Sequence, residues 1–187
     1  MDLLTLDTNI LRDWAWCESR SSENRYGNDD GKKKFLSIAF DKLRLARDQG
    51  KCEIGVTTQI FTDFHKTYGV PPESISEMIG SHIQLTGPSL STFPIMFPIV
   101  FADKDRIEHI LECVFPGADP RSKKHPERRK DALQLYAHRI ADRDYFITSD
   151  KALLSARVRL NGIYSIIVLA LAEYIDILES KDSNQDA

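Results

Sequence analysis

Short runs of apolar residues alternate along this chain with segments in which apolar residues recur every three or four positions. The first pattern is typical of buried β-strands and the second of amphipathic helices. The strands that these runs predict are residues 3–6, 53–56, 99–101, 145–148 and 165–169. The helices that the periodic segments predict are residues 10–14, 35–49, 58–68, 73–79, 103–114, 130–141, 151–160 and 170–178.

Polar and proline-rich segments separate these elements. Residues 18–34 have almost no apolar anchor, and residues 115–126 contain three prolines, so both are expected to be loops. Residues 86–98 also contain three prolines, which restricts them to loop or edge-strand geometry. Residues 181–187 form a polar tail that we expect to be disordered. The remaining pattern predicts a single domain over residues 1–180.

The predicted strands are short and apolar throughout, without alternation of polar and apolar residues inside them. Such strands, separated by helices, favour a parallel sheet that is buried on both faces. The predicted class is therefore α/β. In sheets of this kind, ligands bind beyond the carboxyl ends of the strands.

Composition narrows the class of protein further. A chain of 187 residues with 42% hydrophobic and 28% charged residues has material for one core, which excludes disordered, collagen-like and coiled-coil proteins. The longest apolar stretch, residues 164–172, is shorter than the roughly 20 residues that span a bilayer. The chain also lacks a secretory leader pattern, and its three cysteines have no pairing motif. We therefore expect a cytoplasmic protein with no membrane partner.

The net charge of −3 gives no overall attraction to nucleic acid, so any such argument must be local. Residues 121–130 (RSKKHPERRK) are the one strongly basic run, with Glu127 as the only acid. Taken alone, a run of this kind is more often a solvated loop and first helical turn than a binding surface. The basic residues that it contains are Arg121, Lys123, Lys124, Arg128, Arg129 and Lys130.

Four aspartates are placed where they can meet at one edge of the sheet. Asp7 follows the first predicted strand and Asp150 follows the strand at 145–148, while Asp63 and Asp131 lie on helices next to that edge. Each acid also has a simpler interpretation. Asp7 and Asp150 are suited to capping the helices that follow them, Asp63 to an exposed helical face, and Asp131 to the first turn of a helix.

Four converging carboxylates repel one another unless a cation lies among them. Oxygen ligands suit a hard divalent ion such as Mg²⁺, and such ions serve phosphoryl chemistry with water as nucleophile. Zinc is disfavoured, because the five histidines, His65, His82, His109, His125 and His138, show no zinc-binding spacing. Motifs for a phosphate-binding loop, a dinucleotide fold and a serine hydrolase are also absent from the sequence.

Three segments of the sequence together resemble the PIN domain family, metal-dependent ribonucleases that include VapC-type toxins. They are LLTLDTNIL at 3–11, VTTQIFTDF at 56–64 and KDALQLYAHRIADRDYFITSDKALL at 130–154. The last is the most specific, with a separation of 19 positions between Asp131 and Asp150. The resemblance implies a three-layer α/β/α sandwich around a parallel sheet of four to five strands.

The resemblance also implies roles for individual residues. Asp7, Asp63, Asp131 and Asp150 match the acids that hold Mg²⁺ or Mn²⁺ and carry catalysis in the family. The supporting polar residues that it implies are Asn9, Thr148 and Ser149. The chain departs from the family pattern in three ways: glutamate is commoner at the position of Asp63, a Thr-Pro turn often follows the last strand, and compact members lack the two long loops.

The function implied is hydrolysis of single-stranded RNA by a metal-activated water. The basic run would then bring RNA to the acids, and Tyr26, Trp14 and Trp16 are candidates for stacking on bases, although Trp14 has the spacing of a core residue. A toxin of a toxin–antitoxin pair would also bind an antitoxin, and family members commonly form homodimers.

Two other classes of protein remain open. A PIN-like fold with weak catalysis would serve as a binding or scaffold protein in RNA metabolism, and divalent-metal binding discriminates it from a nuclease. A haloacid-dehalogenase-like phosphatase also has an aspartate after its first strand, but it requires a second acid where this chain has Asn9.

Overall fold

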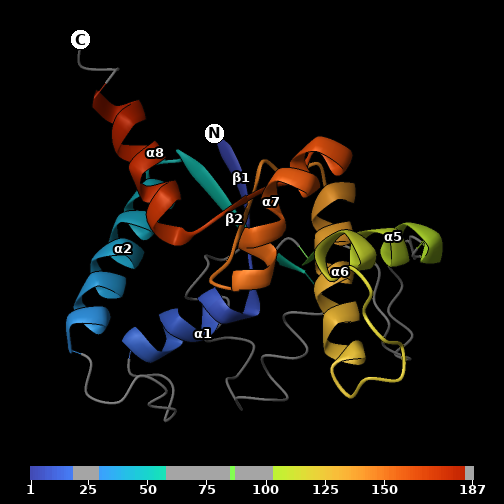
Figure 1. Cartoon of the computed structure of the whole chain (residues 1–187). Coiled ribbons are helices and arrows are strands. Elements are labelled where there is room, and N and C mark those ends of the chain that lie inside the picture. Colours follow the sequence, from blue (N-terminus) through green and yellow to red (C-terminus); the bar gives the residue numbers. More distant parts are fainter. Residues whose placement is uncertain (19–29, 58–84, 87–102, 184–187) are drawn as a thin grey trace.

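The computed structural model describes residues 1–18, 30–57, 85–86 and 103–183 (Figure 1). The strands in these ranges are β1 (Asp2–Leu6), β2 (Cys52–Thr57), β3 (Leu85–Thr86), β4 (Tyr145–Ile147) and β5 (Ile167–Leu169). The helices are α1 (Thr8–Cys17), α2 (Asp30–Asp48), α5 (Lys104–Val114), α6 (His125–Ile140), α7 (Lys151–Tyr164) and α8 (Leu171–Ser183).

The five strands form one sheet in the order β3-β2-β1-β4-β5, and every neighbouring pair is parallel. Leu4 of the central strand β1 lies opposite Ile54 on one side and Tyr145 on the other. All carboxyl ends therefore lie along the same edge, which is the lower edge of the sheet in Figure 1. The predicted α/β class and parallel sheet are confirmed.

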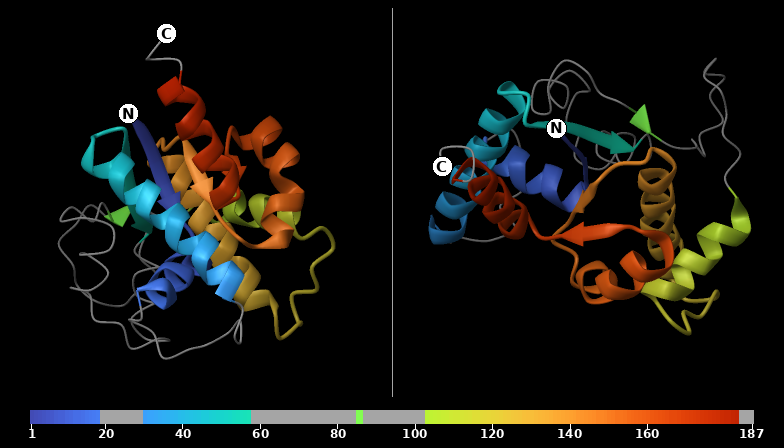
Figure 2. Two further views of the ribbon diagram at one scale, coloured as in Figure 1. Left: turned by 90° about the vertical axis from the view of Figure 1, so that its left-hand side faces the viewer. Right: turned by 90° about the horizontal axis from the view of Figure 1, so that it is seen from above.

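Two hydrophobic clusters cover the two faces of the sheet. Figure 2 shows that helices lie on both of these faces. Helices α1, α2 and α8 supply the cluster on one face, and α5, α6 and α7 supply the other. Strand β4 serves both, because Ile147 packs into the first cluster and its neighbour Phe146 into the second. The predicted three-layer α/β/α arrangement is therefore present.

Several element boundaries differ from the predicted ones. Helix α6 begins at His125, five residues earlier than predicted, because Pro126 occupies its first turn, where a missing N–H is harmless. Helix α2 begins at Asp30, inside the segment expected to be a loop, and α8 continues to Ser183, inside the expected tail. The third strand is at 85–86; the strand predicted at 99–101 lies outside the described residues.

Other predictions also fall outside the described ranges. They are the helices at 58–68 and 73–79, the residues 19–29 of the first long loop, and the last four residues of the tail. Across the residues that the structure does describe, no helix has the length and apolar character needed to cross a membrane.

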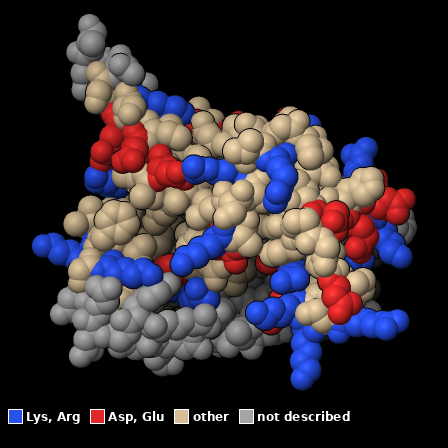
Figure 3. Space-filling view, viewed as in Figure 1, with Lys and Arg blue, Asp and Glu red and all other residues tan. Residues whose placement is uncertain are grey.

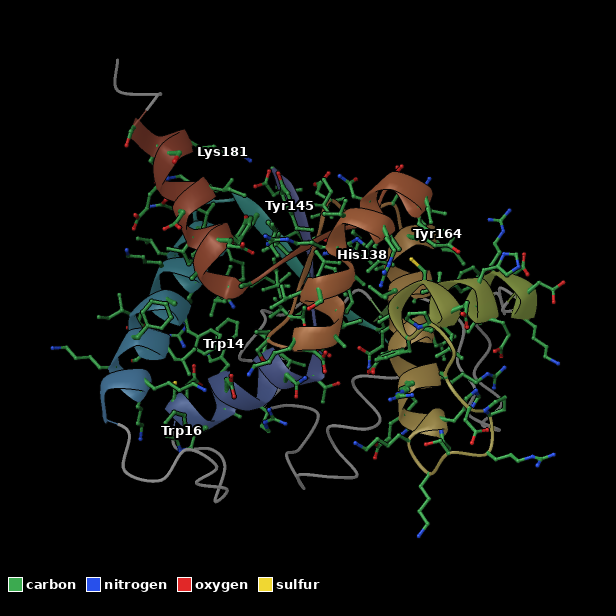
Figure 4. All side chains as sticks on the ribbon, in the orientation of Figure 1. Trp14, Trp16, His138, Tyr145, Tyr164 and Lys181 are labelled. Carbon is green, nitrogen blue, oxygen red and sulfur yellow. The ribbon has the colours of Figure 1, made fainter. Side chains whose placement is uncertain are left out.

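Trp14 belongs to the core and is not available to stack on a base. Its side chain is 0% exposed, its ring stacks on Phe40 with 5.0 Å between centroids, and its indole N–H donates to Glu18 at 2.8 Å. Figure 4 shows Trp14 between α1 and α2. Trp16 is buried in the same cluster, so the base-stacking interpretation is wrong for both tryptophans; Tyr26 is not described.

A buried arginine joins the two central strands of the sheet. Arg143 donates to the carbonyl oxygen of Leu4 from Nε at 3.0 Å and Nη2 at 2.8 Å, and its Nη1 contacts a carboxylate oxygen of Glu53 at 3.1 Å. Its guanidinium group lies over Gly55, where a methyl group would come within 2.7 Å of Arg143 Cζ. A glycine is therefore required at position 55 for packing.

We expect Gly55→Ala to lower the free energy of unfolding by about 1–3 kcal/mol, as overpacking of a rigid core does. Gly162→Ala is the matched control, because Gly162 lies within α7 and a methyl group there meets nothing within 4 Å. The control should be neutral or slightly stabilising, since alanine favours helix. Urea denaturation of both variants checks this, and equal stabilities would contradict the packing argument.

His138 is a buried core histidine whose ring Nδ1 lies 2.9 Å from Thr5 Oγ1 (Figure 4). Burial, together with the positive charges of Arg143 and Arg139, lowers the pKa of His138 from 6.5 to about 3. In the unfolded chain His138 is therefore protonated below pH 6.5, whereas in the folded protein it is protonated only below about pH 3. This group stabilises the fold above pH 6.5, and its contribution falls as the pH decreases from there toward 3.

Acidification to pH 4.5 should cost the wild type about 2–3 kcal/mol through His138 alone. His138→Gln, which cannot be charged, should be less stable than the wild type at pH 7.5 but should lose less on acidification. Chemical denaturation of both proteins across this range measures the difference, in which the contributions of other groups largely cancel. Parallel pH profiles would show that His138 is already charged in the folded protein.

Candidate active site

The ends of β1 and β4 bring polar residues together at the centre of the carboxyl edge. Asp7 follows β1, and Thr148, Ser149 and Asp150 follow β4. The two segments are held side by side, because the N–H of Asp7 donates to the carbonyl oxygen of Ile147 at 2.9 Å. The parallel sheet thus places two of the predicted acids at one position.

Asp7 is fixed by two donors. One of its oxygens, Oδ2, accepts from the Thr148 hydroxyl at 2.6 Å and from the Asn9 amide at 3.2 Å. Its side chain is only 3% exposed, and burial raises its pKa, while the bond from Thr148 opposes that shift. Although Asp7 stands at the N-cap position of α1, its side chain makes no capping hydrogen bond. The capping interpretation of Asp7 is therefore wrong.

Asp150 does cap a helix. Its Oδ1 accepts from the N–H groups of Ala152 at 2.6 Å and Leu153 at 3.2 Å, at the start of α7. Its own N–H donates to the Thr148 hydroxyl at 2.9 Å, so this one hydroxyl connects Asp150 with Asp7. The second carboxylate oxygen of Asp150 accepts no hydrogen bond from a described residue. Capping therefore leaves one oxygen available for a ligand.

Asp131 comes from α6, six residues after the helix begins, and so does not lie in its first turn as predicted. It is half-buried and accepts no hydrogen bond from the described part of the chain. Burial raises its pKa to about 8, and the negative charges of Asp7, Asp150 and Glu127 add to the shift. The three predicted acids that the structure describes are thus close enough to interact electrostatically.

Glu127 is a charge that the sequence analysis did not assign to the site. It lies one turn before Asp131 on α6 and contributes to the raised pKa of that residue. The four-residue spacing on a helix was a visible signal. It was missed because the helix was predicted to begin three residues after Glu127.

Asp63 and Ser149 are the two predicted site residues for which the structure shows no contact with the acids at this edge. Asp63 lies outside the described residues. Ser149 is exposed, and within the described ranges its side chain makes no hydrogen bond. The described hydrogen bonds to the Asp7 side chain therefore come from Asn9 and Thr148 and not from Ser149.

The ligand set suits a hard cation bound partly through water. In the ranges that the structure describes, no three His, Cys, Asp or Glu side chains are grouped closely enough to hold one metal ion. Among the described residues, the carboxylate oxygens of the three acids that accept no hydrogen bond are Oδ1 of Asp7, Oδ2 of Asp150 and both oxygens of Asp131. Since Mg²⁺ accepts one or two direct carboxylates and keeps several waters, these residues fit a hydrated Mg²⁺ or Mn²⁺.

The basic residues before Asp131 are spread over a loop and the first turns of α6. Arg129 forms an ion pair with Glu108 at 3.0 Å, and Arg128 lies over the ring of Phe115 at 5.1 Å. The exposed members are Arg121, Lys123, Lys124 and Lys130. Figure 3 shows Lys and Arg side chains gathered around the lower end of α6.

This arrangement combines one buried and two half-buried carboxylates with a nearby basic surface. It is suited to holding a divalent cation and a phosphate ester, and it contains no cysteine or histidine nucleophile among the described residues at the edge. Comparison of the chain with protein-family models and with curated proteins gave no match. The functional interpretation therefore depends on the residues and their geometry.

Proposed function

We propose that this protein is a PIN-like ribonuclease that uses Mg²⁺ or Mn²⁺ to hydrolyse phosphodiester bonds of single-stranded RNA. The observation that carries the proposal is that the Thr148 hydroxyl links Asp7 and Asp150 at the carboxyl ends of β1 and β4, where the charges of both acids also raise the pKa of Asp131. Three carboxylates that raise one another's pKa favour a bound cation, and the positive charge of Lys130 opposes this shift at Asp131 only in part.

Asp131 and Asp150 would hold the metal through their open oxygens, with Asp7 and the undescribed Asp63 acting directly or through water. A divalent ion bound there would polarise the phosphate and lower the pKa of an attacking water. Thr148 and Asn9 would keep the Asp7 carboxylate in one orientation. Rigid orientation matters because a catalytic group displaced by about 1 Å loses much of its effect.

RNA is favoured as the substrate by the basic residues that precede Asp131. A cationic surface beside an anionic edge attracts phosphates without sequence preference. The residues proposed for this contact are Arg121, Lys123, Lys124, Arg128, Arg129 and Lys130. If the protein is the toxin of a toxin–antitoxin pair, its antitoxin would cover the acidic edge; a homodimer and a cytoplasmic location belong to the same proposal.

Incubation of the purified protein with a labelled single-stranded RNA tests the function. Cleavage in Mg²⁺ or Mn²⁺ that stops in EDTA is the expected result. A phosphomonoester assay run in parallel identifies the phosphatase alternative, which predicts phosphate release and intact RNA. RNA binding with no cleavage of several RNAs in either metal would instead favour the PIN-like scaffold.

A further inference from the structure

A groove between α5 and α6 lies directly beside the acidic edge. The two helices are joined by the Arg129–Glu108 ion pair and by a hydrogen bond of 3.2 Å from the Asp103 N–H to the Tyr136 hydroxyl. A cavity of about 700 Å³ opens between them. This volume lies in the range that accommodates a small organic ligand, roughly 300–1,000 Å³.

The walls of the groove differ in character from its floor. Ile107 and Leu133 line it and are buried, so they form an apolar floor. Lys104 lines it from α5 and Lys130 from α6, and both residues are exposed, so cations stand on opposite rims. Among the described residues of the lining, Glu108 is the one acid, and it is paired with Arg129.

The position of the groove connects it to the acids. Lys130 precedes Asp131 in the sequence and contributes a favourable charge to it, so the α6 rim ends at the proposed catalytic edge. Lys104 lies in another part of the sequence, outside the basic run at 121–130, and is brought to the groove only by the packing of α5 on α6. The groove therefore concentrates positive charge locally in a chain whose net charge is −3.

We propose that this groove binds the stretch of single-stranded RNA next to the cleaved bond, a proposal that rests on the function proposed above. Phosphates would lie on Lys104 and Lys130, and a base would lie against Ile107 and Leu133. Single-stranded nucleic acid alternates an anionic backbone with flat apolar bases, which matches cationic rims over an apolar floor. An acidic peptide would satisfy the rims but would leave the floor uncovered.

Binding of a fluorescent single-stranded RNA of roughly 10 nucleotides, measured by anisotropy in EDTA, tests the groove without cleavage. Lys104→Gln and Lys130→Gln should each weaken binding by about 3- to 10-fold. Each should also reduce the slope of log affinity against log salt concentration by about 0.7. Glu108→Gln should strengthen binding by about 3-fold, because it removes a negative charge from the lining of the groove. Lys34→Gln, at an exposed lysine of α2, is the control and should change nothing.

The gain expected from Glu108→Gln distinguishes a binding role from a structural one, since loss of an ion pair alone would not tighten RNA binding. Wild-type affinity in all three groove variants would overturn the proposal. It would also be overturned if polyglutamate or polyphosphate of equal charge competed as well as RNA, because neither presents a base. Binding is measured without metal and therefore does not depend on cleavage. If the groove variants change RNA binding as expected but the protein cleaves no RNA, the proposed function is contradicted and the groove proposal is not.

Discussion

Asp150→Asn should reduce RNA cleavage at least about 100-fold while leaving the protein as stable as the wild type. Asparagine keeps an oxygen that can accept from the N–H groups of Ala152 and Leu153, and it is as good a helix cap as aspartate. The substitution therefore removes the negative charge and little else. Initial rates in Mn²⁺ and urea denaturation of the same preparations measure the two quantities.

Two further variants separate charge from capping. Asp150→Ala should lose activity to the same extent and should also lose about 1 kcal/mol of stability, because the cap of α7 is removed. Asp176→Asn, at an exposed aspartate of α8 on the other face of the sheet, should change neither quantity. Cleavage by Asp150→Asn within a few-fold of the wild-type rate would show that this charge is not used.

Asp131→Asn should make the metal-free protein more stable, and increasingly so as the pH rises. An unfolded Asp131 loses its proton near pH 4, whereas in the folded protein its pKa is raised to about 8. Between these values the folded state binds more protons than the unfolded state, so the wild type loses stability as the pH increases. Above about pH 8 the Asp131 carboxylate is charged in the folded protein as well, so the wild type loses no further stability as the pH increases.

The stability difference between variant and wild type should be near zero at pH 4 and on the order of 3 kcal/mol at pH 9, after allowing for partial exposure. Denaturation in EDTA across this range measures it. Addition of Mn²⁺ at pH 8 should raise the Tm of the wild type more than that of Asp131→Asn, because bound metal offsets the repulsion. A difference that is the same at every pH would contradict the raised pKa of Asp131, to which burial contributes most and the neighbouring acids add.

The fold could be predicted where local pattern decides structure. Strands β1, β2 and β4 and helices α5 and α7 follow from uniform apolar runs and from three- and four-residue spacing. The start of α6 could not, because Pro126 ends most helical patterns and is tolerated here only at the first turn. The two-residue strand β3 has too little pattern to be recognised, and it pairs with β2 because of the sheet.

The candidate site was predictable to the extent that it consists of strand ends. Asp7 and Asp150 lie near each other because they follow β1 and β4, which are parallel neighbours and end at the same edge of the sheet. The hydrogen bonds by which the Thr148 hydroxyl joins them depend on side-chain geometry, which spacing alone does not give. The charge of Glu127 follows from its four-residue spacing to Asp131 only when the start of α6 is placed correctly. The role of Lys104 could not be predicted from the sequence, because only the packing of α5 on α6 brings it to the same groove as Lys130.

Calorimetric titration with Mn²⁺ determines whether the carboxylate edge is a divalent metal site. We expect saturable binding to the wild type and to Asp176→Asn, and none to Asp7→Asn or Asp150→Asn, with all four proteins folded by circular dichroism. If the wild type does not bind Mn²⁺, or if the wild type and both site variants bind it equally, the carboxylate edge is not a divalent metal site.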